Sequence, residues 1–246
     1  MNEQKVVLLA SYPRSGNTFL RHVLEKVYGV PTWTVYQHEE VTGIESNVLG
    51  DGPRSLTRAP TQLNTAFLKT HHMPYEICKH AWRSIYLVRD GRDAISSQAH
   101  YEQLVGIIKC DGISARSLTV EEIERHIING TPSSEKMAIL ARLVYDWGAH
   151  VLQWTDAADV VIRFEDLVRD PVRTVNYALR EIGLYLPKLP RGQVMSFEQL
   201  HAVNPLFFRS GKSGGRGLSA ENTKLFWSRH GEAMRRLGIN REEETI

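Results

Sequence analysis

The stretch of residues 5–28 constrains the fold more than any other part of this sequence. It begins with an unbroken apolar run at 6–9, which is typical of a strand covered on both faces in a parallel sheet. Apolar residues then recur at helical spacing from Phe19 to Val27. Between them, residues 12–18 combine a turn-setting Pro, a Gly and small polar residues that can cap a helix. We therefore expect a buried strand, a tight loop and a helix.

The loop in this stretch is suited to a phosphate or a sulfate. A strand that leads through a Gly-containing loop into a helix directs backbone N–H groups and the positive end of the helix dipole at one spot. Arg14 adds a full positive charge. The kinase motif GxxxxGKS/T is absent, because Gly16 is followed by Asn17 and not by Lys. A generic strand-to-helix turn with an exposed Arg remains the alternative.

The segment PRSGNTF at 13–19 resembles the 5′-phosphosulfate loop of sulfotransferases, which reads PK/RSGTT or PK/RSGNT followed by an aromatic residue. The co-substrate of this family is 3′-phosphoadenosine 5′-phosphosulfate (PAPS). The resemblance implies PAPS contacts from the loop residues Arg14, Ser15, Gly16, Asn17, Thr18 and Phe19.

Residues 65–74 predict a short strand that ends at a Pro. Alternation along a strand places Lys69 and His71 on one face, and Thr70 and His72 on the other. Ligands collect at the carboxyl ends of strands in α/β sheets, so this basic pair is a candidate for the site. A metal site would need a third ligand at a recognisable spacing, and we find none in the sequence. The run resembles the KTHxP segment of cytosolic-type sulfotransferases, which implies that Lys69 contacts the cofactor and His71 is the base.

A third apolar strand is predicted at 83–90, followed by a helix that carries Ser97. The sequence YLVRDGRDAISS resembles the 3′-phosphate signature YxxRNxxDxxxS of sulfotransferases. This implies that Arg89 and Ser97 bind the 3′-phosphate, which they can do together only if the helix folds back beside the strand. A surface Arg and an ordinary helix Ser are the alternative for each residue alone.

Two later segments resemble sulfotransferase motifs with departures. VIRFEDLVRDP follows a fourth predicted strand at 159–163 and resembles xxYEDLxxDP, with Phe164 at the Tyr position. Phe164 can stack on the base of the cofactor but cannot donate a hydrogen bond. The Gly-rich, basic segment 207–217 resembles the RKGxxGDW loop over the 3′-phosphate, although a disordered linker is the alternative. The resemblance implies cofactor contacts from Arg209, Ser210 and Gly211, where Ser210 replaces the Lys of the motif.

Apolar spacing and capping residues predict further helices. A stripe from 137 to 154 predicts a core helix, Asp170-Pro171 opens one that stops at Gly183, and another runs from about Ser219 to Leu237. The segments 29–64 and 102–133 are expected to be mostly irregular, with one short helix around 120–128. We expect the second segment to form part of a lid over the acceptor, but neither segment carries a motif that identifies it.

The composition restricts the classes of partner. Lys and Arg number 30 against 28 Asp and Glu, so a net charge of +2 argues against nonspecific nucleic-acid binding. Cys78 and Cys110 have neither metal-ligand spacing nor a disulfide framework, which favours a reducing compartment. The start of the sequence leads directly into the first strand without a long apolar segment. We therefore expect a cytoplasmic protein without a membrane span.

The partial matches follow one another in the order of the sulfotransferase family. The resemblance implies one α/β domain over residues 1–246, with a central parallel sheet flanked by helices as in P-loop kinases. It also implies PAPS as co-substrate, 3′-phosphoadenosine 5′-phosphate (PAP) as product, and no metal. The acceptor would be a hydroxyl or amine of a small molecule or glycan.

The expected reaction is an in-line displacement with three catalytic residues. His71 would accept the acceptor's proton, because an imidazole with its ordinary pKa near 6.5 is largely neutral at pH 7. Arg14 would stabilise charge on the leaving oxygen, and Lys69 would contact the cofactor. Glu39 or Glu40 is the alternative base. A kinase, which should have a Lys after Gly16 and carboxylates for Mg²⁺, and a non-catalytic module that binds PAP are the alternative functions.

Overall fold

The computed structural model describes residues 5–35, 65–106, 108–130, 146–190, 193–205, 208 and 217–241. The chain separates into two compact units. The first unit comprises Met1–Ser11, Ser15–Val88 and Ala157–Gly211, and the second comprises Tyr12–Arg14, Arg89–Asp156 and Lys212–Ile246. The organisation of residues 1–246 as one domain stays a prediction.

The first unit contains a five-stranded sheet. Its strands are β1 (Lys5–Ser11), β2 (Thr32–Thr34), β3 (Thr65–Thr70), β4 (Arg83–Val88) and β7 (Val160–Arg163). The order is β2-β3-β1-β4-β7, and all neighbours are parallel. After β1 the chain forms β2 and β3 on one side of β1, and it then crosses to form β4 on the other side. The strand β1 therefore lies at a topological switch point. Ligands of open α/β sheets bind at such a point, beyond the carboxyl ends of the strands.

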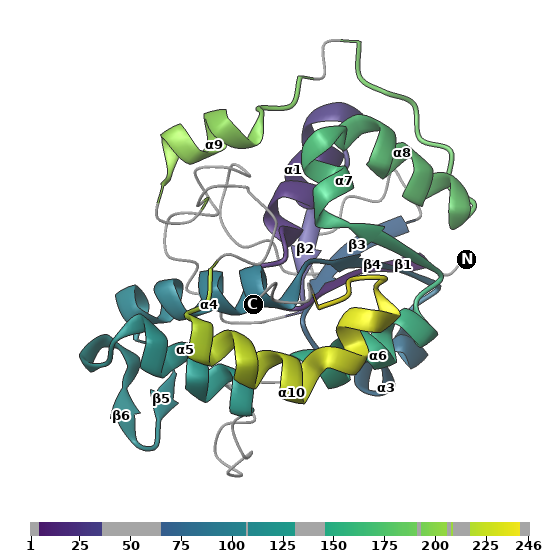
Figure 1. Cartoon of the computed structure of the whole chain (residues 1–246). Helices are drawn as coiled ribbons and strands as arrows, with labels where there is room; N and C mark the ends of the chain where they lie inside the picture. The colour runs from purple at the N-terminus through teal and green to yellow at the C-terminus, as the bar shows by residue number, and fades with distance from the viewer. Residues whose placement is uncertain are drawn as a thin grey trace. The chain divides into compact units, whose positions relative to one another are not determined.

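Helices of the first unit cover one face of this sheet, where Figure 1 shows α1, α7 and α8. Val7 and Leu9 of β1 lie in one hydrophobic core with Leu20 of α1 and Leu179 of α8. The predicted class, a central parallel sheet flanked by helices, is confirmed. The helices of this unit are α1 (Asn17–Tyr28), α3 (Pro74–Ile77), the 3-10 helix η2 (Cys78–His80), α7 (Phe164–Arg169), α8 (Pro171–Glu181) and α9 (Phe197–Val203).

The described part of the second unit consists of helices and one small hairpin. Side chains of Asp90, Thr119 and Ser219 cap the first turns of three helices, as their residue types favour. The elements are α4 (Gly91–Val105), the antiparallel pair β5 (Lys109–Cys110) and β6 (Ile113–Ser114), the 3-10 helix η3 (Ala115–Ser117), α5 (Val120–Asn129), α6 (Trp147–Ala157) and α10 (Ala220–Arg236).

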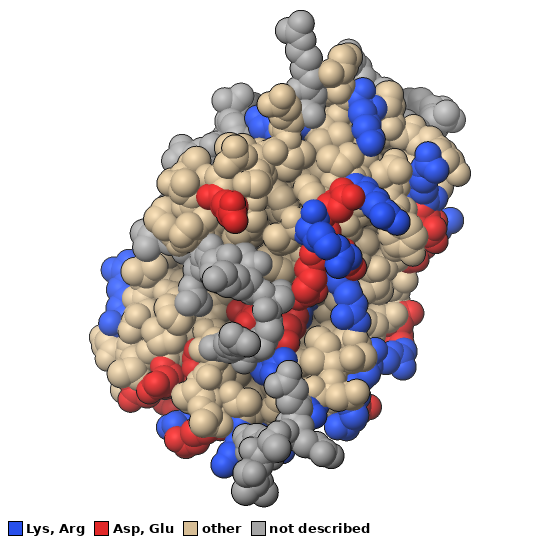
Figure 2. Space-filling model, turned by 45° about the horizontal axis from the view of Figure 1, so that its top comes forward, with Lys and Arg blue, Asp and Glu red and all other residues tan. Residues whose placement is uncertain are grey.

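Charged side chains of both signs are exposed on the molecule. On the face drawn in Figure 2, most Lys and Arg side chains lie near Asp or Glu side chains. This mixture agrees with the nearly balanced net charge of +2. Among the helices of the described residues, none is long and apolar enough to cross a membrane.

Most predicted elements are present where the sequence places them. The four predicted strands correspond to β1, β3, β4 and β7, and the predicted helices at 120–128, 170–183 and 219–237 correspond to α5, α8 and α10. The described part of the predicted helix at 137–154 lies in α6. The short elements β2, β5, β6, α3, α7, α9, η2 and η3 were not predicted, because elements of two to seven residues are too short to show a hydrophobic period.

The prediction of a strand over all of 65–74 is wrong after Thr70. The N–H of His72 donates to Thr70 Oγ1, and the N–H of Met73 donates to Glu76 Oε2, so these donors are satisfied locally instead of in a strand ladder. Strand alternation therefore does not decide which of the two histidines faces the site. Their individual contacts do.

Candidate functional site

The loop after β1 ends at the N-terminus of α1, where Gly16 is the capping residue with φ 96°. The carbonyl of Gly16 accepts the N–H groups of Phe19 and Leu20 at 2.9 and 3.1 Å. Just before it, Ser15 is buried, and its Oγ has no hydrogen-bond partner among the described residues. A buried hydroxyl without a partner is costly, and beside a helix N-terminus it is suited to an anionic oxygen. The loop is therefore suited to an anionic group, and its contact with PAPS stays a prediction.

Phe164 packs against Gly16. A Cβ on Gly16 would lie 2.6 Å from Phe164 Cδ2, so close approach and a positive φ both require glycine here. Phe164 and Phe19 are both buried, and each ring makes an edge contact with Phe197. The two predicted cofactor contacts therefore contribute to the core of the first unit, and stacking of Phe164 on a base stays a prediction.

Asn17 directs its side chain at β1. Its Nδ2 donates to the carbonyl of Leu9 at 2.8 Å and to Ser11 Oγ at 3.1 Å. Thr18, the next residue of α1, is also buried. Because both amide hydrogens of Asn17 donate to β1, the donor that remains for the predicted cofactor contact is its backbone N–H.

His71 lies one residue beyond β3, beside the end of β1. Its Nδ1 is 2.7 Å from the carbonyl oxygen of Ser11 and 3.4 Å from Ser11 Oγ. A carbonyl oxygen only accepts, so Nδ1 carries the proton of the neutral ring and Nε2 carries the lone pair. This tautomer is the one that a base acting through Nε2 requires. Ser11 could not be identified from the sequence, since a serine after an apolar run does not indicate which histidine it contacts.

The neighbours of His71 have different surroundings. Lys69 is buried in β3 and is paired in register with Leu9 of β1. The side chain of His72 is 36% exposed, and its Nδ1 lies 3.4 Å from Glu76 Oε2 at the start of α3. His71 is thus the histidine that contacts the end of β1, and its role as the base stays a prediction. No His, Cys, Asp and Glu side chains of the described residues group in a way that could hold a metal ion.

Arg14, Arg89 and Ser97 lie together within the second unit. Arg14 Nε donates to Ser97 Oγ at 3.3 Å, and Arg89 Nη1 donates to the carbonyl of Arg14 at 3.0 Å. The Arg14 guanidinium lies 4.9 Å from the ring centroid of Tyr101, a cation–π contact. The backbone φ of Arg14 is 63°, which is uncommon for a residue with a side chain. The helix α4 therefore folds back far enough to bring Ser97 to Arg14, and the anion-binding role of the group stays a prediction.

The remaining predicted site residues lie outside the described residues. These are Arg209, Ser210 and Gly211, and the alternative bases Glu39 and Glu40. The first described residue after Gly211 is Gly217, whose carbonyl accepts a hydrogen bond from Ser96 Oγ at 3.1 Å. Ser96 directly precedes Ser97 on α4.

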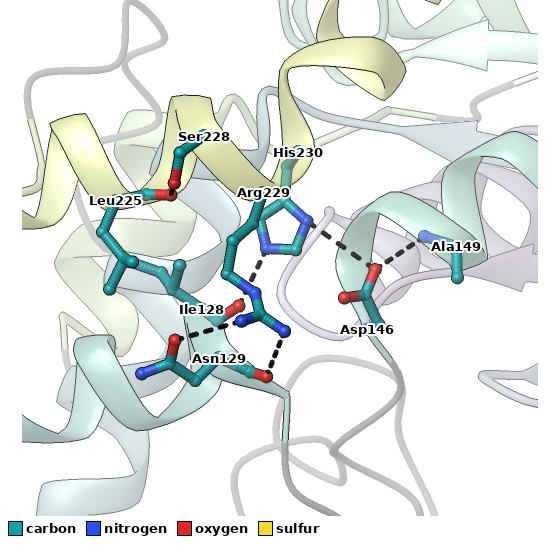
Figure 3. A network of polar contacts seen from close by, with 8 residues as sticks. All are labelled: Ile128, Asn129, Asp146, Ala149, Leu225, Ser228, Arg229 and His230. Carbon is teal, nitrogen blue, oxygen red and sulfur yellow. Dashed lines mark hydrogen bonds and ion pairs between the residues drawn. The ribbon is translucent and has the colours of Figure 1, made fainter.

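A second buried histidine, His230 of α10, is enclosed by groups of the second unit (Figure 3). Its Nε2 donates to the carbonyl of Ile128 at 3.1 Å, and its Nδ1 lies 3.6 Å from Asp146 Oδ1. Burial lowers the pKa of His230, and the nearby Asp146 carboxylate opposes this shift. Asp146 Oδ1 also accepts the N–H of Ala149 at 2.7 Å, so the network joins α5, α6 and α10.

Comparisons with known proteins agree with this geometry. Residues 4–188 match the family model described as "Sulfotransferase domain". No curated protein matches the chain. The mouse sulfotransferase SULT7A1 complexed with PAP is similar in structure, with a TM-score of 0.61, 20% identity, and coverage of 94% of this chain and 85% of that chain.

Two structures of retinol dehydratase are also similar. The complex with androsterone and inactive cofactor PAP has a TM-score of 0.60 and 16% identity, and covers 98% of this chain and 83% of that chain. The complex with retinol and PAP has a TM-score of 0.57 and 16% identity, and covers 99% and 84%. At sequence identities of 16–20%, these similarities show that the folds are alike and nothing more. Because the family model covers well over half of the chain, this chain belongs to the sulfotransferase domain family.

Proposed function

We propose that the chain transfers a sulfuryl group from PAPS to a hydroxyl or amine of a small-molecule or glycan acceptor and releases PAP. The observation that carries the proposal is the 2.7 Å contact between His71 Nδ1 and the Ser11 carbonyl. It leaves Nε2 as a hydrogen-bond acceptor at the carboxyl end of the sheet, where a base is needed. Membership of the sulfotransferase family supplies the reaction class.

Two groups of residues are proposed to bind the two anionic ends of PAPS. The Ser15 hydroxyl, which has no hydrogen-bond partner among the described residues, and the backbone N–H groups from Gly16 to Thr18 fit the 5′ end. Arg89 and Ser97 are proposed for the 3′-phosphate, because guanidinium and hydroxyl groups are good phosphate donors. By family resemblance, the remaining proposed contacts are Phe19, Phe164, Arg209, Ser210 and Gly211.

Bound PAPS would supply an activated sulfuryl group, and the protein would move one proton and stabilise charge. His71 Nε2 accepts the proton of the acceptor hydroxyl as that oxygen forms a bond to sulfur. The bond between sulfur and the bridging phosphate oxygen breaks, and the electron pair leaves with PAP. Arg14 stays protonated near neutral pH, so its contribution, like that of Lys69, is electrostatic.

Radiolabelled PAPS and pools of candidate acceptors test the proposal with the purified full chain. The pools are phenols, aliphatic and steroid alcohols, amines and oligosaccharides. The expected result is labelled product from at least one pool, with PAP formed in equal amount. His71→Ala should abolish most of the transfer, and His72→Ala is the matched control.

The alternatives give different results in the same assay. Phosphate transfer from ATP with Mg²⁺, without transfer from PAPS, would favour a kinase. Tight PAP binding in calorimetry without transfer to any pool would favour a non-catalytic module. If neither PAPS nor PAP binds, the proposal is wrong.

A further inference from the structure

We propose that the Asn17 side chain is a positioning group that acts through Ser11 on His71, and is not a ligand of the cofactor. The inference rests on the proposed function, since it assigns a role within the same site. It concerns three residues of the first unit that come from α1, the end of β1 and the end of β3.

The orientation of the Asn17 amide is fixed by its partners. The carbonyl of Leu9 only accepts hydrogen bonds, so the atom 2.8 Å away must be Nδ2 and not Oδ1. The second hydrogen of Nδ2 is directed to Ser11 Oγ at 3.1 Å. One amide group thus binds the backbone carbonyl of Leu9 and the side chain of Ser11 at the carboxyl end of β1.

Ser11 connects this amide to His71. The register between β1 and β3 ends at Ala10 and Thr70, one residue before Ser11 and His71. Beyond this point the contact between the two segments is made by a side chain, because His71 Nδ1 donates to the Ser11 carbonyl at 2.7 Å. A shift of Ser11 would therefore move the group that fixes the ring tautomer of His71.

All three residues of the network are buried. The exposed fractions of Ser11, Asn17 and His71 are 0%, 4% and 9%. Asn17 Oδ1 is buried and has no hydrogen-bond partner among the described residues. An unsatisfied buried oxygen is unfavourable, so the amide contributes here through its two donors. At this position an aspartate would have no donor. A threonine, which occupies this position in the PK/RSGTT form of the sulfotransferase loop, would have only one.

Asn222 of α10 is a matched control. It is buried, and its Nδ2 likewise donates to a backbone carbonyl and a side-chain oxygen, those of Glu121 and Glu124, both at 3.0 Å. Asn17→Ala and Asn222→Ala remove the same set of donors. Only the first removal touches the contacts of His71.

The test is the ring tautomer of His71, read by NMR on ¹⁵N-histidine-labelled full-length protein with PAP and without acceptor. The wild-type chain should show a protonated Nδ1 and an unprotonated Nε2. Asn17→Ala should show a mixture of the two tautomers, and turnover should fall by at least about tenfold, since small displacements of a catalytic group have effects of this size. The PAP Kd should change by less than about threefold. Asn222→Ala should lower the Tm and keep the wild-type tautomer.

Each other outcome overturns a specific statement. A wild-type tautomer in Asn17→Ala would overturn the positioning role, and so would a tenfold loss of PAP affinity with the tautomer unchanged. If Asn17→Ala does not fold, Ser11→Ala and Ser11→Thr replace it, because the threonine keeps the hydroxyl and should restore turnover. If the tautomer shifts as expected but the wild-type chain sulfates no acceptor, the proposed function fails and the positioning role stands.

Discussion

His71 and His230 are both buried histidines whose rings contact a backbone carbonyl, but their second ring nitrogens differ. In His71, Nδ1 donates to Ser11 and Nε2 is the nitrogen proposed to accept the substrate's proton. In His230, Nε2 donates to Ile128 and Nδ1 faces Asp146, a group that also begins α6. Burial alone therefore does not distinguish the proposed base from a histidine that only packs in the core. The partners of the two nitrogens do.

The comparison predicts opposite effects of the same substitution at the two histidines. His71→Ala should lower turnover about 10²- to 10⁴-fold, the usual contribution of a positioned base, with little change in Tm. His230→Ala should keep turnover per folded molecule and lower the Tm, because it removes packing and a buried hydrogen bond. Steady-state kinetics and thermal unfolding of both variants check this. A loss of turnover in His230→Ala at unchanged Tm would contradict the structural role of His230.

The same contrast applies to two arginines near the start of α4. Arg89 is proposed to bind phosphate, and charge-assisted hydrogen bonds of this kind are worth about 1.5–3 kcal/mol. Arg89→Ala should therefore weaken PAP binding about 10- to 150-fold in calorimetry. Arg92 pairs with Asp90 at 2.7 Å, so Arg92→Ala should affect mainly stability. Unchanged PAP affinity in Arg89→Ala would remove that residue from the site.

Gly16 allows the packing of the loop to be tested separately from its charged groups, because Gly16 has no side chain. Gly16→Ala would place a Cβ 2.6 Å from Phe164 at a backbone φ of 96°. Overpacking and strain of this kind cost about 1–3 kcal/mol each. The Tm should fall by roughly 2–4 °C for each kcal/mol in a chain of this size. A Tm equal to the wild type would show that the loop is not packed against Phe164.

His230 should also give a small pH dependence of stability. Burial lowers its folded-state pKa below the ordinary value of 6.5, so on acidification the unfolded state binds the proton first. This contribution is fully present above pH 6.5 and is lost as the pH falls toward the folded-state pKa. His230→Gln should make the Tm less dependent on pH between about 5 and 7. The exposed His80 is the control, and an equal effect of His80→Gln would contradict the assignment.

Much of this fold and part of the site could be predicted from the sequence. The apolar runs at β1, β3, β4 and β7 are long enough to identify strands, and the Pro13–Thr18 loop identifies the turn into α1. β2 has three residues and sits in a segment without periodicity, so no pattern predicts it. The contact of Arg14 with Ser97 depends on how α4 folds back, which spacing alone does not determine.

The contacts of Asn17 and Ser11 could not be predicted for a different reason. A motif identifies which residues occupy a loop, and Asn17 was therefore predicted to bind the cofactor. Its amide donates to β1, a tertiary contact that the sequence does not indicate, and the cofactor contact of Asn17 stays a prediction. The contact of Ser11 with His71 can be recognised only when the register of β1 and β3 is known, because this register brings the two residues together.

The most direct measurement of the central claim is single-turnover transfer of label from radiolabelled PAPS, with the wild-type chain and His71→Ala compared at saturating PAPS. We predict that the wild-type chain moves the label to the acceptor with one PAP formed per product. The His71→Ala chain should bind PAP with near wild-type affinity and transfer the label about 10²- to 10⁴-fold more slowly. A wild-type transfer rate in His71→Ala would contradict the account and assign proton removal to another group.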